Sequence, residues 1–409
     1  MTSAMVMGLF AVGASAQLNF LVMGDWGGLP GPIWSTPAEH STADAMNQEA
    51  AKIGATFALA LGDNFYENGI KTDEHDSRFK HTFEDVFDGG NLKAENFFKV
   101  LAGNHDHYGN VSAQIAYSAI SDRWHFPSLY YSWVETGPDF AAEFVQLDTV
   151  TLSGDSSDPI TGEEMLGTDP RMAPADPIAA GEQYAWLNAT LAASTADFIF
   201  VSGHFPVWSV CEHGPTGSLV TTLKPILEAH GVSAYFAGHD HCEEHIDDNG
   251  GVQYHVVGAA NQNGGNDKNK DKIPADQLKF LDIGTPIGVH FVQGGFGSVT
   301  IASKAAGAVV KHFRTAAVGD GYKTMYTAPP IAARSGPAVA TAASLRNKTS
   351  AVPCAHPMEA CNQDPKYPPA CCNNLCKCST GAIGSVCCNG AEDVGKVYTD
   401  EEFAAFRHR

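Results

Sequence analysis

Seven side chains that can bind metal ions follow short apolar segments of this 409-residue chain. They are two carboxylates, a phenol, an amide and three imidazoles: Asp25, Asp63, Tyr66, Asn104, His204, His239 and His241. Oxygen and imidazole donors without a thiolate favour hard or borderline cations. Seven donors are too many for one tetrahedral ion, and they suit two ions about 3.5–4 Å apart that share a bridging carboxylate. The residue types therefore predict a two-metal site that is suited to phosphoryl transfer.

The segments that must position these residues share one pattern, an apolar run that ends in Gly followed by Asp, Asn or His. The runs are Leu18–Met23, Thr56–Leu61, Phe97–Ala102, Phe198–Ser202 and Ser233–Ala237. Continuous apolar runs of this length that end in Gly are typical of buried strands. Gly at the end of a strand allows a tight turn that brings the next side chain to the rim of the sheet. In an extended segment His239 and His241 point to the same side, so each can reach a different ion.

Helical segments are expected between these strands. The candidates are Ser41–Ile53, Arg78–Phe87, Val111–Ile120, Glu182–Ala193 and Leu219–His230. Strands that alternate with helices predict an α/β fold with its ligands at the carboxyl ends of the strands. Further apolar or alternating segments are expected to complete a second sheet: Leu129–Val134, Glu143–Asp148, Val252–Val257, Gly288–Gln293, Gly297–Ala302 and Ala308–Phe313.

Composition and charge exclude several classes of partner. A hydrophobic content of 44% and a charged content of 17% suit a globular protein with a core. The formal net charge of −21 argues against a nucleic-acid partner and against an anionic membrane surface. An acidic protein that binds an anionic substrate needs a strong local cation, and a bound metal ion is the simplest one.

The N-terminus predicts a secretory route. Residues 1–16 contain an apolar run and end in Ala14-Ser15-Ala16, which is typical of a signal-peptide cleavage site, although a flexible N-terminus that leads into the first strand is the alternative. No apolar stretch of membrane-spanning length follows. Three N-x-S/T sequons, at Asn110, Asn188 and Asn347, could carry glycans on that route. We expect a secreted, extracellular or lumenal protein.

The cysteines divide into two groups. Eight of the ten lie between Cys354 and Cys388, a density that favours disulfide bonds outside the cytosol over a zinc site. The other two, Cys211 and Cys242, belong to the main domain. The expected layout is a signal peptide (1–16), a catalytic domain (17–330), a linker (331–352), a Cys-rich disulfide module (353–391) and a polar tail (392–409). An adhesion or carbohydrate-contacting role and a passive stabilising role both remain open for the Cys-rich module.

Ordered motifs make the prediction more specific. The strings Gly24–Gly28, Gly62–Tyr66, Gly103–His107, Gly203–Trp208 and Gly238–His241 resemble the metallophosphoesterase blocks of the purple acid phosphatases, and most of all those of the small, animal-type, tartrate-resistant group. Segments Phe83–Phe87, Asn110–Tyr117 and Glu212–Thr216 are also similar to that group. The resemblance runs from about Leu18 to about Phe313. It implies a four-layer α/β/β/α sandwich with two mixed sheets.

The resemblance also implies how the ligands are shared. Asp25, Tyr66 and His241 would hold one metal ion, Asp63 would bridge, and Asn104, His204 and His239 would hold the other. A phenolate ligand favours Fe(III), and the second ion would be divalent iron, zinc or manganese. The position two residues after the first Asp, where many metallophosphoesterases have His, is Gly27 here, and Tyr66 is the replacement that the purple group uses.

The implied activity is hydrolysis of phosphate monoesters, either small phosphate esters or phosphoproteins, by direct attack of a metal-bound hydroxide in acid. His105 and His213 match the family's transition-state-stabilising histidines, and His213 is the better candidate to protonate the leaving alkoxide. Two alternatives stay open at this point. One is a phosphodiesterase or nucleotide pyrophosphatase that uses the same metals, and the other is a secreted iron-binding protein with little turnover.

For several residues within or near the motifs we predict supporting or structural roles. Asp106, His107 and Asp240 are expected to orient neighbouring groups, and His125, His245, His255 and His312 to have ordinary core or surface roles. Cys211 and Cys242 flank ligand-bearing loops, so we expect a disulfide bond between them and not a metal thiolate. The acidic segment 151–182 matches a loop that restrains activity in the resembled family until proteolysis, and it is either such a lid or a variable insertion.

Overall fold

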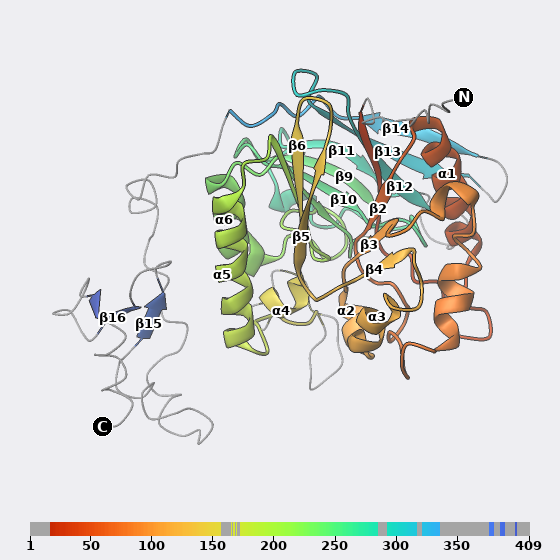
Figure 1. Ribbon diagram of the computed structural model, residues 1–409, viewed down its shortest axis with the longest axis horizontal. Helices are drawn as coiled ribbons and strands as arrows, with labels where there is room; N and C mark the ends of the chain where they lie inside the picture. The colour runs from red at the N-terminus through yellow and green to blue at the C-terminus, as the bar shows by residue number, and fades with distance from the viewer. Residues whose placement is uncertain are drawn as a thin grey trace, which may run out of the picture. The chain divides into compact units, whose positions relative to one another are not determined.

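Two mixed sheets of seven strands each form the centre of the main unit, Met1–Ala338, in the computed structural model (Figure 1). The structure describes residues 17–156, 165, 167, 169, 172–284, 293–316 and 321–335, together with three short backbone segments nearer the C-terminus. The predicted signal peptide, the sequon at Asn347, most of the predicted linker and most of the polar tail lie outside the described residues. The chain divides into two compact units, Met1–Ala338 and Val339–Arg409.

The first sheet has the strand order β14-β13-β12-β1-β2-β3-β4. Its strands are β1 (Leu18–Met23), β2 (Phe57–Ala60), β3 (Phe98–Val100), β4 (Trp124–His125), β12 (Gly295–Ile301), β13 (Ala308–Thr315) and β14 (Tyr322–Thr327). Strands β1 to β4 are parallel, and β12 to β14 add an antiparallel extension beside β1. The first three predicted ligand-bearing strands are therefore adjacent and point in one direction.

The second sheet has the order β11-β9-β10-β8-β7-β6-β5. Its strands are β5 (Tyr131–Thr136), β6 (Ala141–Gln146), β7 (Phe198–Ser202), β8 (Ala234–Ala237), β9 (Glu243–Asp247), β10 (Gln253–Val257) and β11 (Leu278–Asp282). Strands β6, β7, β8 and β10 run parallel, and the remaining strands pair antiparallel at the two sides. The other two ligand-bearing strands, β7 and β8, are neighbours in this sheet.

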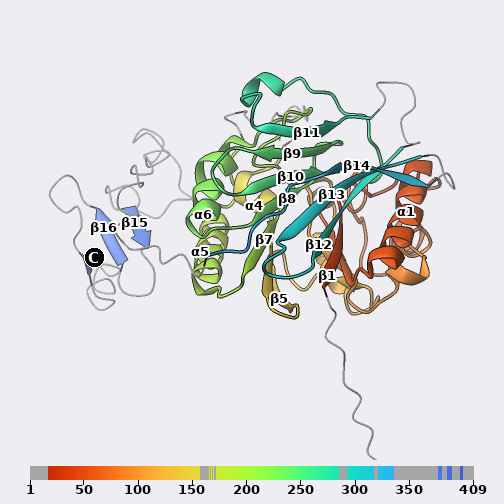
Figure 2. The same cartoon turned by 90° about the horizontal axis from the view of Figure 1, so that it is seen from above.

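Helices cover the outer faces of both sheets (Figure 2). They are α1 (Pro37–Ile53), α2 (Asn104–His107), α3 (Val111–Tyr117), α4 (Thr149–Ser153), α5 (Pro177–Ala193) and α6 (Lys224–Ala229), with the short helical segments Phe79–Glu84, Gly90–Leu92, Leu219–Leu223 and Lys270–Lys272. In both views α1 lies on one flank of the sheets, while α5 and α6 lie on the opposite flank. The predicted α/β fold with two mixed sheets and flanking helices is confirmed.

Three separate apolar clusters explain why there are four layers. Along β1 the side chains alternate, so that Phe20 and Val22 face the second sheet while Leu21 and Met23 face the helices on the other side. Phe20 packs edge-on against Phe144 of the second sheet, with ring centroids 5.1 Å apart. A third cluster joins the second sheet to α5. Because both faces of each sheet are covered, the central strands are apolar throughout, as buried parallel strands usually are.

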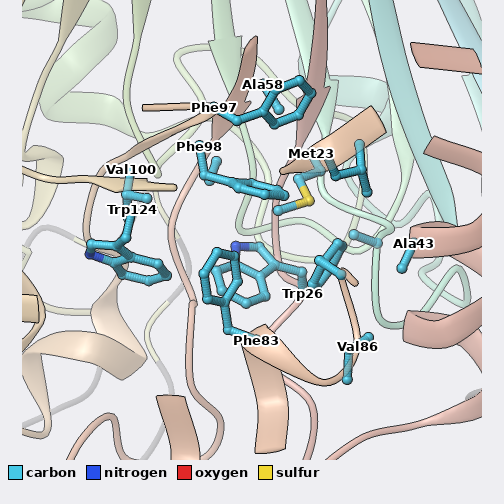
Figure 3. Close-up of a cluster of buried hydrophobic side chains, with 14 of the residues drawn as sticks. Met23, Trp26, Ala43, Ala58, Phe83, Val86, Phe97, Phe98, Val100 and Trp124 are labelled. Atoms are coloured by element: carbon cyan, nitrogen blue, oxygen red, sulfur yellow. The ribbon is translucent and has the colours of Figure 1, made fainter. Parts of the chain in front are cut away.

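The cluster on the outer side of the first sheet is rich in aromatic rings (Figure 3). Trp26 is fully buried there, with ring centroids 5.8 Å from Phe83 and 6.0 Å from Trp124. Aromatic pairs at these separations contribute about 0.5–1.5 kcal/mol beyond the area that they bury. Because Trp26 directly follows the predicted ligand Asp25, this packing anchors the turn that carries the ligand.

Helix α1 begins earlier than the sequence analysis predicted. Thr36 caps it, since its side chain accepts a hydrogen bond from the Glu39 amide and the Glu39 side chain accepts one from the Thr36 amide. Pro37 occupies the first turn, where a missing amide hydrogen costs nothing. This capping box extends the helix to Pro37–Ile53, whereas the apolar pattern alone predicted a start at Ser41.

One topological expectation was wrong. Segments Gly297–Ala302 and Ala308–Phe313 were assigned to a second sheet, but they form β12 and β13 of the first sheet, where Leu18 pairs with Ile301. Their apolar patterns show only that they are buried strands and do not specify the neighbour, which depends on long-range pairing. The expected segments near β5, β6 and β10 do lie in the second sheet, and most of Gly288–Gln293 lies outside the described residues.

The chain past Pro330 still packs on the main unit. Ile331 forms a bridge with Ala308, and Arg334 donates hydrogen bonds to the carbonyls of Ala196 and His230. In the second unit β15 (Cys376–Ser379), β16 (Ser385–Cys388) and β17 (Val397–Tyr398) pair antiparallel. The disulfide module itself stays a prediction. Among the described residues, no helix has the length and apolar character needed to cross a membrane.

Candidate metal centre

The predicted ligands meet where five strands end. Strands β1, β2 and β3 are parallel and in register, so the residues that follow them, Asp25, Asp63 and Asn104, emerge at one edge of the first sheet. His204 follows β7 and His239 follows β8 in the second sheet. The two sheets thus contribute to one site, and not one sheet alone.

Three of these ligands have a left-handed backbone, which is uncommon for residues other than Gly. The φ angles are +58° at Asp25, +51° at Asp63 and +69° at His239. Such conformations cost free energy and persist where the surrounding structure enforces them, which happens most often at functional sites. The turn after each strand aims the side chain across the sheet edge and away from solvent.

The glycines that precede the ligands are needed for close approach. A Cβ atom on Gly103 would collide with the Asp63 carboxylate, and one on Gly238 would collide with the Asp25 carboxylate. The sequence analysis explained these glycines by turn formation. Their larger role is to let one strand end pass directly over the carboxylate of another.

The seven predicted ligands form two groups that meet at Asp63. In the first group the Tyr66 hydroxyl lies 3.1 Å from Asp25 Oδ1 and 2.9 Å from His241 Nε2. In the second group His204 Nε2 lies 2.9 Å from Asn104 Oδ1, and the His204 and His239 ring centroids are 5.2 Å apart. Asp63 contacts both groups, since it interacts with Tyr66 and its Oδ1 lies 3.4 Å from His204 Nε2.

The polar atoms that surround His204 are arranged in a way that suits a bound cation. His204 Nδ1 lies 2.8 Å from the Leu61 carbonyl, which can only accept, so Nδ1 carries a proton, and in the neutral imidazole Nε2 then presents a lone pair. That lone pair faces Asn104 Oδ1 and Asp63 Oδ1. Three acceptors thus converge with no hydrogen between them. Such an arrangement is repulsive unless a positive ion occupies the space.

The orientation of the Asn104 amide supports this assignment. Its Nδ2 donates to the Tyr108 hydroxyl at 3.2 Å, and that hydroxyl donates to Asp155 Oδ1 at 2.9 Å. The amide oxygen must therefore face His204. The sequence analysis missed Tyr108 and Asp155. The four-residue spacing between Asn104 and Tyr108, which places both on one face of helix α2, is the signal that could have found the first of them.

The first group also needs positive charge. Burial, together with the neighbouring Asp63 charge, raises the pKa of the Asp25 carboxyl. Burial and the Asp25 carboxylate likewise raise the pKa of the Tyr66 phenol, so a phenolate at this position requires a compensating cation. Burial alone would raise the pKa of Asp63, but His204 and His105 outweigh it, and the pKa lies below its ordinary value.

The ligand imidazoles are suited to bind metal in acid. Burial, reinforced by neighbouring histidines, lowers the pKa of His239 well below its ordinary value and lowers the pKa of His241 to about 4. Burial lowers the pKa of His204 in the same way. Neutral imidazoles keep a lone pair available, so these three side chains can bind a metal ion in mildly acidic solution.

A dinuclear metal centre fits these residues. The ligand atoms of Asp25, Asp63 and His204 all lie within 4.8 Å of one another, and all three residues are buried. The donors are carboxylate, phenol, amide and imidazole, which is the set that hard and borderline cations prefer.

The two predicted proton-handling histidines lie on different sides of this cluster. His105 Nδ1 lies 2.5 Å from the Glu67 carbonyl, so its Nε2 is directed at the site, 3.9 Å from Asp63 Oδ2. Burial lowers the pKa of His105, but the Asp63 carboxylate and the hydrogen bond to Glu67 together outweigh that effect, and the pKa is raised. The His213 ring lies over His239, with ring centroids 4.1 Å apart and an angle of 33° between the planes.

Asp106 and His107 orient other groups, as expected. Asp106 accepts hydrogen bonds from the backbone amide of Asn64, which follows Asp63, and from the backbone amide of Gly103, which precedes Asn104. It also accepts one from Gln114 Nε2. Burial raises the pKa of Asp106 to about 6. His107 Nε2 lies 3.1 Å from Asp148 Oδ2.

Cys211 and Cys242 form a disulfide bond, which confirms the predicted pairing. The predicted sequons at Asn110 and Asn188 are both on the main unit. Asn110 caps α3 by accepting from the Ala113 amide, and Asn188 Oδ1 lies 2.9 Å from His230 Nε2. Glycosylation at these sites remains a prediction.

The described parts of segment 151–182 contact the site loops. Gly167 donates its amide hydrogen to the His213 carbonyl at 3.1 Å, and Asp155 accepts from Tyr108 as described above. Contact of this kind is what a lid would make. Restraint of activity by this segment is a prediction that the contacts alone do not test.

The two facing sheets and the clustered ligands define a metallophosphoesterase. A profile of the family described as "Calcineurin-like phosphoesterase" matches residues 18–243, and the chain belongs to this family. Human tartrate-resistant acid phosphatase type 5 is 43% identical over 303 residues, which cover 74% of this chain and 89% of that protein. Purple acid phosphatase 17 of Arabidopsis thaliana is 30% identical over 270 residues, which cover 65% of this chain and 75% of that protein. Within its family the chain thus belongs with the purple acid phosphatases.

Solved structures support the same fold. GAP50, the anchor in the inner membrane complex of Plasmodium, superposes with a TM-score of 0.61 at 23% identity, covering 79% of this chain and 90% of that one. Purple acid phosphatase PPD1 from yellow lupin seeds superposes with a TM-score of 0.51 at 15% identity, covering 76% of this chain and 53% of that one. At these identities the likeness extends to the fold alone.

Proposed function

We propose that the protein is a secreted acid phosphatase that hydrolyses phosphate monoesters at a dinuclear Fe(III)–M(II) centre, in which M is iron, zinc or manganese. The observation that carries the proposal is the convergence of His204 Nε2, Asn104 Oδ1 and Asp63 Oδ1, which present three lone pairs to one another when the His204 imidazole is neutral. The relatives named above are acid phosphatases, and they match this chain over most of its main unit.

The ligand grouping supports the assignment of each ion. Asp25, Tyr66 and His241 would hold Fe(III), because a phenolate oxygen is a hard anionic donor. Asn104, His204 and His239 would hold the divalent ion, with Asp63 bridging. When bound, such a pair of cations supplies activation of water and neutralisation of phosphate charge.

The protein's own side chains would handle protons on either side of the phosphate. His105 holds its Nδ1 proton against Glu67, so Nε2 is free to donate toward a phosphate oxygen when it is protonated. The raised pKa of His105 keeps it cationic in acid, where a cation stabilises the developing negative charge. His213 is the candidate that donates a proton to the leaving alkoxide.

Secretion is supported by two features of the chain. Residues 1–16 have the pattern of a signal peptide. The Cys211–Cys242 disulfide is buried in the main unit, and disulfide bonds are typical of oxidising compartments. The net charge of −21 favours small phosphate esters or phosphoproteins over nucleic acid as substrates.

The test of the activity combines metal content, the visible spectrum and substrate preference on freshly purified protein. We expect two metal ions per chain, a visible band that disappears in Tyr66→Phe, and nitrophenyl phosphate turnover at least about tenfold above that of the bis-nitrophenyl diester, which is a difference of about 1.4 kcal/mol in barrier. Preferred diester turnover would replace the proposal with a phosphodiesterase. A purple protein with no turnover would replace it with an iron-binding role.

The role of His213 has a separate test. His213→Ala should lower kcat about 10²-fold for alkyl phosphates, whose leaving groups need a proton, and much less for nitrophenyl phosphate, whose leaving group is already stable. Equal losses on both substrates would remove the proton-donor assignment while leaving the phosphatase assignment intact.

A further inference from the structure

The loop that carries the proposed proton donor is fastened to the loop that carries two metal ligands. We call residues 209–214 the His213 loop. It follows Trp208, and it faces the turn that contains His239, Asp240 and His241. A general acid acts only when it lies within hydrogen-bond reach of its acceptor, so the position of this loop matters for the proposed reaction.

Asp240 holds the His213 loop through both carboxylate oxygens. Oδ1 accepts the His213 amide hydrogen at 2.7 Å. Oδ2 accepts from the Ser209 hydroxyl at 2.5 Å and from the Gly214 amide at 3.3 Å. Asp240 is fully buried, so water does not compete for these hydrogen bonds.

The Cys211–Cys242 disulfide makes a covalent second attachment between the same two loops. Cys211 lies two residues before His213, and Cys242 directly follows His241. Both cysteines are fully buried. Cys211 lies between Ser209 and His213, which both donate hydrogen bonds to Asp240, so the disulfide and the hydrogen bonds fasten the same short stretch of backbone.

Other contacts complete the attachment of this loop. The Glu244 carboxylate accepts from the Val210 amide at 3.1 Å. Asn269 Nδ2 donates to the carbonyls of Cys211 and Glu212, at 2.5 and 3.0 Å. These contacts order the His213 loop before a substrate binds. A proton donor that is already in position avoids the entropic cost of being positioned during the reaction.

We propose that Asp240 and the Cys211–Cys242 disulfide are positioning residues for His213, a role that rests on the proposed function of His213 as proton donor. They touch neither the substrate nor the reacting atoms. They act through the His213 loop, by holding its backbone against the turn that carries His239 and His241. This is a positioning role beyond general stabilisation of the fold.

Two other roles are conceivable for the same contacts, and the experiment must separate them. Asp240 lies between two metal ligands, so it could serve only to place His239 and His241. The disulfide could serve only global stability. The first role predicts loss of metal ions, and the second predicts equal loss of all activities in proportion to the unfolded fraction.

The experiment compares two variants of the metal-loaded full chain, Asp240→Asn and the double variant C211A/C242A. Asp240→Asn leaves this side chain one acceptor oxygen in place of two, so at least one of the three hydrogen bonds from the His213 loop to residue 240 is lost. We expect kcat for glycerol phosphate to fall about 10²-fold in both variants, with a loss of at most about threefold on nitrophenyl phosphate. Both variants should keep the metal content of the parent.

Combination with His213→Ala supplies the decisive readout. If Asp240 and the disulfide act through His213, either change should have no further effect on glycerol phosphate turnover once His213 is alanine. Multiplicative losses in the combined variants would overturn the proposal, as would equal losses on the two substrates. Asp282→Asn is the matched control, because this buried carboxylate of the same sheet pairs with Arg314 and does not touch the His213 loop. It should preserve the ratio of the two activities.

Amide hydrogen exchange gives a readout that does not depend on activity or on metal. In metal-free protein we expect the amides of His213 and Gly214 to exchange at least about tenfold faster in both variants than in the parent, while the amides of β8 stay protected. Unchanged exchange in the loop would overturn the proposal. Faster exchange throughout the second sheet would also overturn it, since the residues would then be general stabilisers. Should the parent itself show no phosphatase activity, the proposed function fails, and the exchange result still decides whether these contacts order the loop.

Discussion

Two buried clusters in this molecule are built from the same residue types, and only one of them has the features of a metal site. The first is the ligand cluster around Asp63 and His204. The second, which we call the histidine cluster, consists of Glu243 and His245 on β9, His255 on β10 and His312 on β13. Its members are also almost fully buried.

The difference lies in where the hydrogens are. In the histidine cluster His312 Nδ1 lies 2.6 Å from Glu243 Oε2, and His312 Nε2 lies 3.0 Å from His255 Nδ1. His245 lies within hydrogen-bond distance of the Tyr326 hydroxyl and Gln253 Oε1. Each of these contacts can hold one proton between one donor and one acceptor. At His204, by contrast, three acceptors meet when the imidazole is neutral.

The two clusters also differ in the charge of their side chains. Burial lowers the pKa of His255 well below its ordinary value and lowers the pKa of His312 to about 3, so both are neutral. A neutral set of side chains that are joined by these hydrogen bonds needs no ion to balance its charge. The comparison teaches that residue type and burial do not identify a metal site, whereas an arrangement of lone pairs that lacks hydrogens does.

The largest expected effect comes from removing the carboxylate that joins the two ligand groups. Asp63→Asn should lower kcat about 10³-fold and reduce the bound metal, because the shared negative charge between the cations is lost, at about 1.4 kcal/mol per factor of ten. Metal analysis and nitrophenyl phosphate turnover measure both effects. Asp282→Asn serves as control, and a variant at Asp63 with full metal content and parental kcat would contradict the assignment.

Removal of the metal ions should lower the free energy of unfolding, by an amount that depends on the ratio of free metal concentration to the dissociation constant. A ligand present at 100 times its dissociation constant stabilises the folded state by about 2.7 kcal/mol. We therefore expect chelation to lower the unfolding midpoint of the parent and to have little effect on Asp63→Asn. Thermal unfolding with and without chelator checks this, and identical midpoints for the parent in both conditions would argue against a tightly bound centre.

The histidine cluster should behave in the opposite way. His312→Leu leaves Glu243 and His255 without their partner, which should cost about 2–4 kcal/mol of unfolding free energy for two buried polar groups. Metal content and kcat should stay at parental values, as measured by metal analysis and urea denaturation of the same preparation. Loss of metal in this variant would erase the distinction between the clusters.

The smallest expected effect concerns the ion pair between His107 and Asp148, two charged side chains that stabilise each other without a metal ion. Burial by itself lowers the pKa of His107, but Asp148 raises it overall. Burial would raise the pKa of Asp148, but His107 lowers it below its ordinary value. A raised histidine pKa stabilises the fold below about pH 6.5, and this contribution is lost as the pH rises through the folded pKa. A lowered aspartate pKa stabilises the fold above about pH 3.9, and this contribution is lost as the pH falls through the folded pKa.

The two effects overlap in mildly acidic solution. His107→Gln should therefore cost about 1 kcal/mol near pH 5.5, and almost nothing near pH 8, since the His107 side chain is partly exposed and solvent screens the pair. Urea denaturation across this pH range is the measurement. A cost that does not vary with pH would assign the effect to packing.

Much of the fold was predictable because local patterns dictated it. The five apolar runs that end in Gly became β1, β2, β3, β7 and β8, and the helices between them are present with shifted ends. The assignment of β12 and β13 to the wrong sheet has a physical cause. Pairing of β1 with β12 joins residues almost the whole length of the main unit apart, and no local pattern encodes that choice.

The sequence predicted which side chains would lie close together, and their role as metal ligands stays a prediction. Asp25, Asp63, Tyr66 and the other ligands were all placed together by the fold. The supporting contacts of Tyr108, Asp155 and Ser209 were missed, because they depend on turns and on segments that are remote in the chain. Spacing within a helix could have suggested Tyr108, while nothing local points to Ser209.

The division of the ligands between two sheets has a consequence for biosynthesis. The ribosome releases Asp25 and Asp63 long before His239 and His241, and β1 must also wait for its neighbour β12. Until those later segments emerge, the early carboxylates have only part of their ligand set. Under the proposed ligand assignment, a metal pair can therefore bind in its final position only after almost all of the main unit has been translated, so metal binding would come after synthesis of the domain.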